Sequence, residues 1–304
     1  MDVTIIINQM AMMMIMLCVG VIGAKAGVVD QQTNRCLSRF AMAIPQCAII
    51  LSSAMGMERE MTAGRVLMLL GVGCAANGLL LTVCLLVPRL LRSRSPDRGL
   101  YSFLGAFGNV AFMGYPILRA LYGGDAVFYA ALMSVSFNVL TFTVGVRLLG
   151  GGGERFDWRQ LLTPALVASV AAVAVIFLPV DWPMPLREAA DYLGNMIVPL
   201  SMIIIGASLG EQRLRDVFGA WRAYAFAPVK LLAAPALVWA VMGLVLDEPM
   251  LLGIVTVEAA MPSATVGVML SIQYGANEKL ASQVVFVTTV LSAVTIPLVC
   301  WVLL

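Results

Sequence analysis

The chain consists of long apolar stretches separated by short segments rich in charged and turn-forming residues. Apolar residues run almost continuously through these stretches and do not alternate with polar ones, which is typical of transmembrane helices rather than barrel strands. A helix needs roughly 20 apolar residues to cross a membrane. The sequence predicts ten spans, at residues 4–24, 37–57, 66–88, 100–121, 126–148, 161–179, 190–210, 225–246, 249–275 and 280–303.

The composition excludes the water-soluble classes of protein. Hydrophobic residues make up 61% of the 304 residues, charged residues make up 12%, and the mean hydropathy is +0.95. Soluble domains carry about 25% charged residues, so this chain has too few charges to cover a water-facing surface. A net charge of +2 does not point to a nucleic-acid partner. We therefore predict an all-α integral membrane protein, surrounded by membrane lipid and without a nucleic-acid partner.

Basic residues are distributed unequally between alternate loops. With the N-terminus outside, the inner loops contain 14 of the 19 lysines and arginines and the outer loops contain 4. Because cytoplasmic loops carry the excess of basic residues, this predicts a cytoplasmic-membrane protein with both termini extracytoplasmic. The stretch 1–24 has Asp2 in place of a basic n-region and lacks a small-residue cleavage motif, so we interpret it as a retained first helix.

Prolines recur at matching places in two halves of the chain. Pro45 and Pro199 lie in the second and seventh spans, and Pro116 and Pro262 lie in the fourth and ninth. Two equivalent halves with five spans each must be inserted in opposite orientations, as in many secondary transporters. The alternative is that these four matching positions arise by chance, since proline is frequent in membrane helices. We expect a first five-helix repeat at 1–148, a short cytoplasmic linker at 149–160 and a second five-helix repeat at 161–304.

The fourth and ninth spans contain residues that break helices. Residues 105–116 include three glycines and a proline, and Pro262 with Ser263 lies between Glu258 and Gly267. Proline removes a backbone donor, and glycine permits unwinding. A break at this depth is tolerated where it lines a cavity. Two broken helices that cross would direct half-helix N-termini at one point and favour an anion there.

Ionisable residues inside the spans are few. Glu258 is the one acidic residue that we place well inside a span, where a carboxylate costs about 2.5–3.5 kcal/mol. We interpret it as a coupling site for a proton or a cation. A neutral, hydrogen-bonded glutamic acid and a misplaced span boundary are the alternatives. Lys230, early in the eighth span, is expected to snorkel to the inner interface, and an ion pair with Glu258 is the alternative.

Asn109 and Asn138 are amides inside the fourth and fifth spans. Each could contact a substrate carboxylate or bond to a neighbouring helix, and the position of Asn109 beside the predicted break favours substrate. Hydroxyls such as that of Thr288 are interpreted as helix-packing groups. We expect no metal site, and we expect the substrate site to contain Asn109, Gly114, Tyr115, Pro116, Asn138, Pro262 and Ser263.

Several stretches resemble the auxin efflux carrier family, which includes bacterial permeases associated with malonate and malate and the plant PIN-formed auxin exporters. They are GNVAFMGYPIL at 108–118, MPSATVGVMLSIQYG at 261–275 with the downstream ASQVVFVTTVLSAVTIPL, and, more weakly, residues 37–50 and 198–209. The resemblance implies ten helices in two inverted repeats, similar to bile acid sodium symporters. It implies a scaffold of helices 1, 2, 6 and 7 and a transport domain of helices 3–5 and 8–10. Helices 4 and 9 would cross at Pro116 and Pro262, where an organic anion binds.

The resemblance also implies a homodimer formed through the scaffold and an elevator movement. In the symporters, acidic and amide residues beside the crossing hold sodium, whereas the plant exporters work without a coupling ion. The ion at Glu258, H⁺ or Na⁺, therefore stays open, and we expect no other cofactor. The predicted function is secondary transport of small organic anions, chiefly carboxylates. An uncoupled channel or a membrane sensor on the same fold is the alternative. An enzyme is not expected, because the chain has no histidine and no aspartate that we place inside a span.

Overall fold

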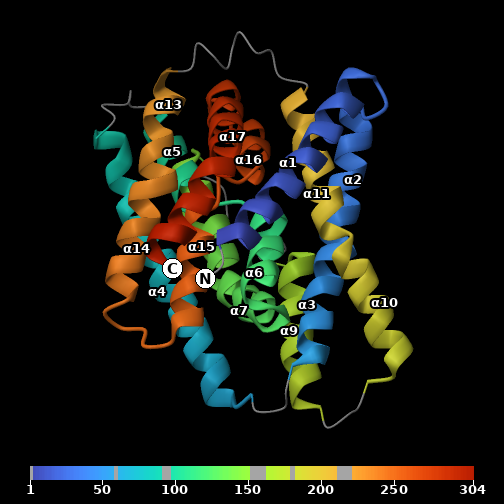
Figure 1. Ribbon diagram of the computed structural model, residues 1–304. Helices are drawn as coiled ribbons and strands as arrows, with labels where there is room; N and C mark the ends of the chain where they lie inside the picture. Colours follow the sequence, from blue (N-terminus) through green and yellow to red (C-terminus); the bar gives the residue numbers. More distant parts are fainter. Residues whose placement is uncertain (1–2, 58–60, 91–96, 151–161, 179–181, 211–220) are drawn as a thin grey trace.

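The computed structural model describes residues 3–57, 61–90, 97–150, 162–178, 182–210 and 221–304 (Figure 1). These residues form helices and one isolated β-bridge, which confirms the all-α prediction. Nearly all of the predicted linker 149–160 lies outside the described residues. So do Arg59 of an outer loop and six arginines of the basic inner loops: Arg92, Arg94, Arg155, Arg159, Arg213 and Arg215.

The first half of the chain contains two unbroken helical segments and three that are kinked, interrupted or locally widened. In chain order the elements are α1 (Val3–Lys25), α2 (Gln31–Ala43), α3 (Pro45–Gly56), α4 (Ala63–Leu90), α5 (Arg98–Ala106), the π-helix η2 (Val110–Gly114), α6 (Tyr115–Tyr122), α7 (Gly124–Leu140), the π-helix η3 (Thr141–Gly145) and α8 (Val146–Leu148).

The second half follows a similar order. Its elements are α9 (Pro164–Phe177), α10 (Met184–Asn195), α11 (Ile197–Gly210), α13 (Trp221–Pro228), the π-helix η5 (Val229–Ala233), α14 (Ala234–Met242), α15 (Pro249–Ala260), α16 (Val266–Gln273) and α17 (Glu278–Leu303).

The helices are long and apolar enough for a multi-pass membrane protein. Among the described residues, seven helical segments meet the length and hydropathy of a span: Ile7–Lys25, Gln31–Gly56, Ala63–Arg89, Gly124–Leu148, Met184–Gly210, Trp221–Met242 and Glu278–Leu303. The three other stretches expected to span are the 14-residue α9 and the two interrupted pairs, α5 with α6 and α15 with α16. In these last two pairs each helix is too short to cross a membrane alone, because the chain is interrupted between the two helices.

Two spans are kinked at corresponding places. Pro45 begins α3 directly after the kink at Ile44, because proline has no N–H to donate and restricts the residue before it. In the seventh span α10 ends at Asn195, and Pro199 is the third residue of α11. The two prolines that the sequence pairs therefore both open the second half of a kinked span.

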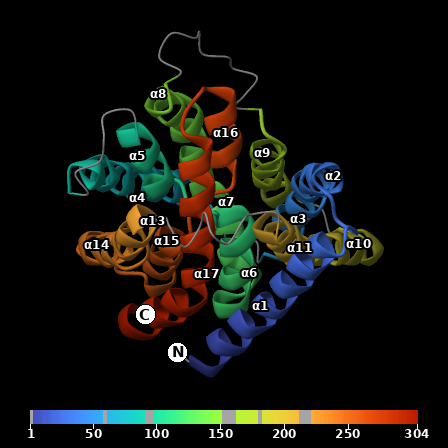
Figure 2. The ribbon, with the colours of Figure 1, turned by 90° about the horizontal axis from the view of Figure 1, so that it is seen from above.

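In the view from above, two groups of helices lie on opposite sides of α6 and α7, although α1 of one group also packs on α17 of the other (Figure 2). The first helix group contains α1–α3 and α9–α11, in which α1 packs on α11 and α3 packs on both α9 and α10. The second helix group contains α4, α5, α13–α15 and α17, in which α4 packs on α5 and α14 packs on α15. α6 lies between the groups and contacts α1 as well as α7. The second half of the interrupted fourth span therefore runs along the boundary of the two groups.

Glycines bring α1 and α11 together backbone to backbone. A Cβ added at Gly20 would overlap the backbone of Ile203, and one added at Gly206 would overlap the carbonyl of Leu17. Small residues of this kind let membrane helices approach closely and pack by van der Waals contact.

Replacing Gly206 with alanine is therefore expected to destabilise the protein by about 1–3 kcal/mol, as overpacking does. The measurement is the apparent melting temperature of the purified protein in detergent. Gly71→Ala on α4 is the matched control, because a Cβ at Gly71 meets nothing within 4 Å. Equal melting temperatures for the two variants would contradict the close packing of α1 on α11.

Candidate substrate site

The fourth span is interrupted between α5 and η2. After Ala106 the chain turns extended at Phe107, with φ −105° and ψ 102°, and helical geometry resumes at Val110. The ninth span is interrupted in the same way, because α15 ends at Ala260 and Met261 is extended with φ −61° and ψ 143°. Both breaks fall where the sequence predicts them from glycine and proline.

The two extended segments meet and hydrogen-bond to one another. The N–H of Asn109 donates to the carbonyl of Pro262 at 2.7 Å, and the N–H of Ala264 donates to the carbonyl of Phe107 at 3.0 Å. Gly108 and Ser263 form an isolated antiparallel bridge between these bonds. Unpaired backbone groups are costly at membrane depth, so each break satisfies part of the backbone of the other.

Gly108 is needed for this approach. A Cβ at Gly108 would lie 3.2 Å from Cβ of Met261 and 3.3 Å from its carbonyl oxygen. Both contacts are tighter than ordinary van der Waals contacts, and the backbone of Met261 cannot easily shift to relieve them. Glycine at this position therefore lets the two segments lie close enough to bond.

Ser263 connects the ninth-span break by hydrogen bonds to α17 and to α5. The residue is fully buried; its N–H donates to Oγ1 of Thr288 at 3.2 Å, and its hydroxyl donates to the carbonyl of Leu104 at 2.8 Å. Thr288 also donates to Val284 on its own helix, in keeping with the packing role predicted for it. The hydroxyl of Ser263 is already used within the protein, although the sequence predicts it as a substrate contact.

Asn109 and Glu258 each carry a buried polar atom without a protein partner. Both side chains are buried, and neither Nδ2 of Asn109 nor Oε1 of Glu258 has a hydrogen-bond partner among the described residues. Buried polar groups in native proteins are paired in the large majority of cases, and an unpaired one calls for an explanation such as a ligand or an ion. These two atoms, one from each break, are the strongest indication of a binding site.

A narrow cavity lies beside the breaks. It measures about 10 Å³, roughly the space of a single water molecule. Residues from six elements and the connection between α5 and η2 form its wall: Ala76, Asn77, Leu80, Ala106, Gly108, Val110, Phe137, Val238, Val255, Glu258 and Ala259. Glu258 and Asn77 are the polar side chains in this wall.

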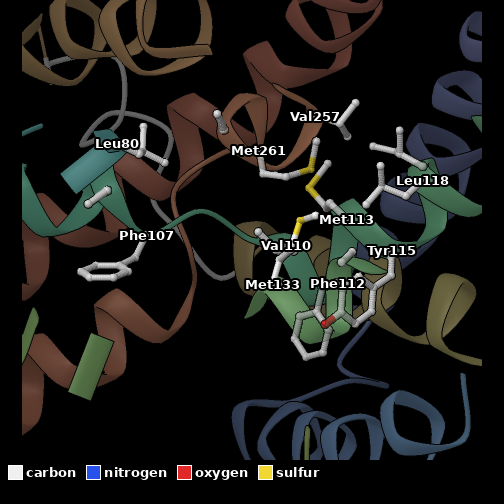
Figure 3. Close-up of a cluster of buried hydrophobic side chains, with 14 of the residues drawn as sticks. Leu80, Phe107, Val110, Phe112, Met113, Tyr115, Leu118, Met133, Val257 and Met261 are labelled. Atoms are coloured by element: carbon white, nitrogen blue, oxygen red, sulfur yellow. The ribbon is translucent and has the colours of Figure 1, made fainter. Parts of the chain in front are cut away.

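Apolar side chains cover the other side of the break (Figure 3). Met113 and Met261 lie next to each other there, and a Cβ at Gly114 would lie 3.5 Å from Cγ of Met261. Tyr115 is buried and its hydroxyl lies 2.8 Å from Oγ of Ser134, while Pro116 is buried in the first turn of α6. Gly114, Tyr115 and Pro116 therefore shape the break, and their predicted contact with substrate stays a prediction.

Asn138 takes part in the packing of its own helix. Its amide donates to the carbonyl of Ser134, one turn earlier on α7, at 3.0 Å, and the side chain is half-buried. The structure does not bring its amide into a hydrogen bond with either break. A contact between Asn138 and substrate stays a prediction that this geometry does not support.

The prediction that Lys230 snorkels to the interface is wrong. Its side chain is 1% exposed, and its Nζ donates to the carbonyl of Ala259 at 3.0 Å. The alternative, an ion pair with Glu258, is also absent from the ion pairs of the described residues. Lys230 lies nine residues after the start of α13, in η5, so it reaches the ninth-span break rather than the membrane surface.

Asn77 is a further cavity residue that the sequence analysis does not single out. Its amide donates to the carbonyl of Gly73 at 2.9 Å and to Oγ of Ser136 at 3.0 Å. An amide in the middle of the third apolar stretch is the signal that could have found it.

A second cavity, of about 500 Å³, opens at the opposite end of α6 from the break. Arg119 on α6 donates to Asp191 on α10 there, at 2.6 Å. This ion pair joins α6 to the first helix group. The cavity wall is formed by Ser52, Ser53, Gly56, Arg119, Gly124, Asp125, Trp182, Met184, Arg187, Glu188 and Asp191.

Comparison with known proteins shows the family. The family model described as "Membrane transport protein" matches residues 5–158 and 153–300. A protein of Rhizobium meliloti named "Putative malonate transporter" is 27% identical over 218 residues, which cover 68% of each chain. An "Uncharacterized transporter" of Methanothermobacter thermautotrophicus is 26% identical over 293 residues, which cover 94% of each chain.

The family match spans both halves of the chain and includes both breaks. It confirms the resemblance to the auxin efflux carriers, which the motifs at 108–118 and 261–275 indicate. The chain therefore belongs to the membrane transport protein family of auxin efflux carriers.

Proposed function

We propose that this protein is a secondary transporter of small organic anions, chiefly carboxylates, across the cytoplasmic membrane, and that substrate binds where the fourth and ninth spans meet. The observation behind this proposal is the pair of buried, unpartnered polar atoms, Nδ2 of Asn109 and Oε1 of Glu258. The amide nitrogen of Asn109 can donate to a carboxylate oxygen. Glu258 is then the site of the coupling ion, H⁺ or Na⁺.

Two features favour an anion at this place. The helical turns that follow the breaks, in η2 with α6 and in α16, begin beside the bonded segments, and helix N-termini attract negative charge. One relative is named a malonate transporter, and malonate is a small dicarboxylate. Because both features concern charge rather than shape, they support the substrate class and not one compound.

The proposed architecture is ten spans in two inverted repeats, 1–148 and 161–304, similar to bile acid sodium symporters. Recurrent helix contacts support it: α1 packs on α11 as α9 packs on α3, and α4 packs on α7 as α13 packs on α17. The contact of α6 with α7 is likewise matched by that of α16 with α17. Each pair joins elements at equivalent places in the two halves.

The transport movement that we propose is an elevator. The first helix group would be the scaffold and the homodimer contact, and the second helix group, with α6, α7 and α16, would move with the substrate. The separation of the two groups in Figure 2 supports this division. The connection from α1 to α2 and the facing ends of α16 and α17 lie at one end of the molecule, the top of Figure 1. These ends adjoin basic loops, so we assign that end to the cytoplasm.

Asn109→Ala is expected to weaken carboxylate binding at least tenfold, because a hydrogen bond to a charged group contributes about 1.5–3 kcal/mol. The measurement is the rise in melting temperature of the purified protein with acetate, pyruvate, malonate and succinate as choline salts, since a ligand that binds the folded state stabilises it. Transport of the same compounds is measured in proteoliposomes.

Asn8→Ala, at an exposed position of α1, is the control for loss of an amide. It is expected to bind and transport as the wild type does. If Asn109→Ala kept wild-type binding and transport, Asn109 would be removed from the site. If none of the four carboxylates stabilised the wild type, the proposed substrate class would be wrong.

A further inference from the structure

Two buried ionisable side chains from different elements lie at the ninth-span break. The ammonium of Lys230, on η5, donates to the carbonyl of Ala259, and Glu258 is the preceding residue of α15. Glu258 and Ala259 both line the cavity beside the break. The ammonium of Lys230 is therefore bonded to the backbone of a cavity-wall residue that is next in the chain to Glu258, whose carboxyl oxygen has no partner.

Neither group is neutralised by an ion pair. The ion pairs in the described part of the chain are Arg65–Glu248 and Arg119–Asp191. Cys84 of α4 is a titratable group near Lys230, and Tyr115 of α6 is one near Glu258.

The other elements packed on α15 add little charge near these groups. α14 and η2 have no ionisable residue. Those of α7 lie in its first turns, Asp125 and Tyr129, and those of α17 lie near its ends, Glu278, Lys279 and Cys300. Besides Cys84 and Tyr115, those of α4, α6 and α13 are Arg65, Cys74, Arg89, Arg119, Tyr122, Arg222 and Tyr224. Among the described residues, Lys230 and Glu258 are the charged side chains that are buried, so the local balance depends on them.

Charge balance links these two groups to the substrate. Uncompensated charge is expensive inside a membrane protein. An empty site is neutral when Lys230 is charged and Glu258 is ionised. With a singly charged carboxylate bound, such as pyruvate or malonate that has itself taken up one proton, the site is neutral when Glu258 is protonated. Binding of the anion therefore replaces the negative charge of Glu258 with its own.

We propose, on the basis of the function proposed above, that the protein is a proton-coupled carrier in which Lys230 holds the compensating positive charge and Glu258 takes up the proton. The carboxylate enters as an anion, one proton from water binds to a carboxylate oxygen of Glu258, and both leave together on the other side. Lys230 acts on Glu258 and the substrate through its positive charge. Its ammonium keeps its bond to Ala259 and does not have to contact the substrate.

The donor set of the cavity favours a proton over a metal cation. Hard cations are held by several oxygen ligands at once. Among the side chains of the cavity wall, Glu258 and Asn77 supply oxygen, which is fewer ligands than such a cation takes, and the amide nitrogen of Asn77 is already bonded to Gly73 and Ser136. A proton needs a single oxygen and no additional space.

The test is the number of protons taken up when the purified wild-type protein binds malonate. Isothermal titration in two buffers of different ionisation enthalpy, in choline salts and over a series of pH values, gives this number. The wild type is expected to take up about one proton more per malonate than Glu258→Gln at the pH of greatest difference. Comparing the two proteins removes any proton that malonate itself binds.

Variants of Lys230 separate this role from simple packing. Lys230→Met is expected to bind malonate at least tenfold more weakly and to lose the extra proton, because Glu258 is then already protonated in the empty site. Lys230→Arg is expected to keep the extra proton. Lys25→Met and Glu278→Gln, at exposed positions, are the charge-matched controls and are expected to behave as the wild type.

The possible outcomes distinguish failure of the proton coupling from failure of the proposed transporter function. Malonate binding with equal proton uptake by the wild type and Glu258→Gln would overturn the coupling and leave the transporter standing. Binding that requires sodium and lacks the extra proton would also overturn it, in favour of sodium coupling. If Lys230→Met folds poorly, the comparison of proton uptake between the wild type and Glu258→Gln still tests the coupling. Failure of acetate, pyruvate, malonate and succinate to bind would overturn the proposed function instead.

Discussion

Joining position 119 to position 191 is expected to stop transport completely. Arg119 on α6 and Asp191 on α10 form an ion pair between an element that we assign to the moving group and one that we assign to the scaffold. An elevator must separate such a pair in every cycle, so a covalent link should hold the carrier in one state. The measurement is carboxylate uptake by Arg119→Cys/Asp191→Cys protein treated with a short bifunctional, reducible thiol reagent, before and after reduction.

A second ion pair provides the matched control. Arg65 on α4 and Glu248 at the start of α15 also pair, but both belong to the proposed moving group. Linking positions 65 and 248 is therefore expected to leave transport largely unchanged. Both double variants require replacement of the accessible native cysteines, Cys18, Cys36, Cys47 and Cys74. Full transport by the protein linked at 119 and 191 would rule out sliding of α6 against α10.

Gly108→Val is expected to abolish detectable carboxylate binding. A Cβ at this position already lies 3.2 Å from Met261, and the two further methyl groups of valine have no room to avoid its backbone. The segments would be forced apart, with loss of the bonds from Asn109 to Pro262 and from Ala264 to Phe107. The readout is the malonate-dependent rise in melting temperature, together with the melting temperature of the unliganded protein.

Gly78→Val on α4 controls for the effect of valine in a membrane helix, because a Cβ at Gly78 meets nothing within 4 Å. It is expected to keep ligand-dependent stabilisation. If Gly108→Val retained wild-type binding, the bonded arrangement of the two breaks would not be required for the site.

The course of the helices was largely predictable because each expected span is an apolar stretch bounded by charge or turn residues. Glycine and proline located both breaks: the fourth span loses its helix at Phe107 and the ninth at Met261. Local chemistry decides these features, since the loss of a backbone donor or of a Cβ acts within one turn. That the two breaks bond to one another depends on residues about 150 positions apart, which no local pattern specifies.

Side-chain partners were harder to predict for the same reason. Lys230 lies near the start of an apolar stretch, where snorkelling is the usual result, yet α13 begins early enough to carry it to the break. Ser263 and Asn138 could each have faced substrate, but their partners are Leu104 and Ser134. Each outcome depends on which helix packs beside the residue, and the sequence of one span does not contain that information.

Exchange of labelled malonate across proteoliposomes tests the central claim most directly. Vesicles that contain the purified protein and unlabelled malonate are placed in a small concentration of labelled malonate. A carrier with one alternating site is expected to accumulate label transiently, with saturable initial rates and with loss of the effect in Asn109→Ala. Uptake that rises linearly with concentration and is not stimulated by internal malonate would contradict a carrier and indicate a channel.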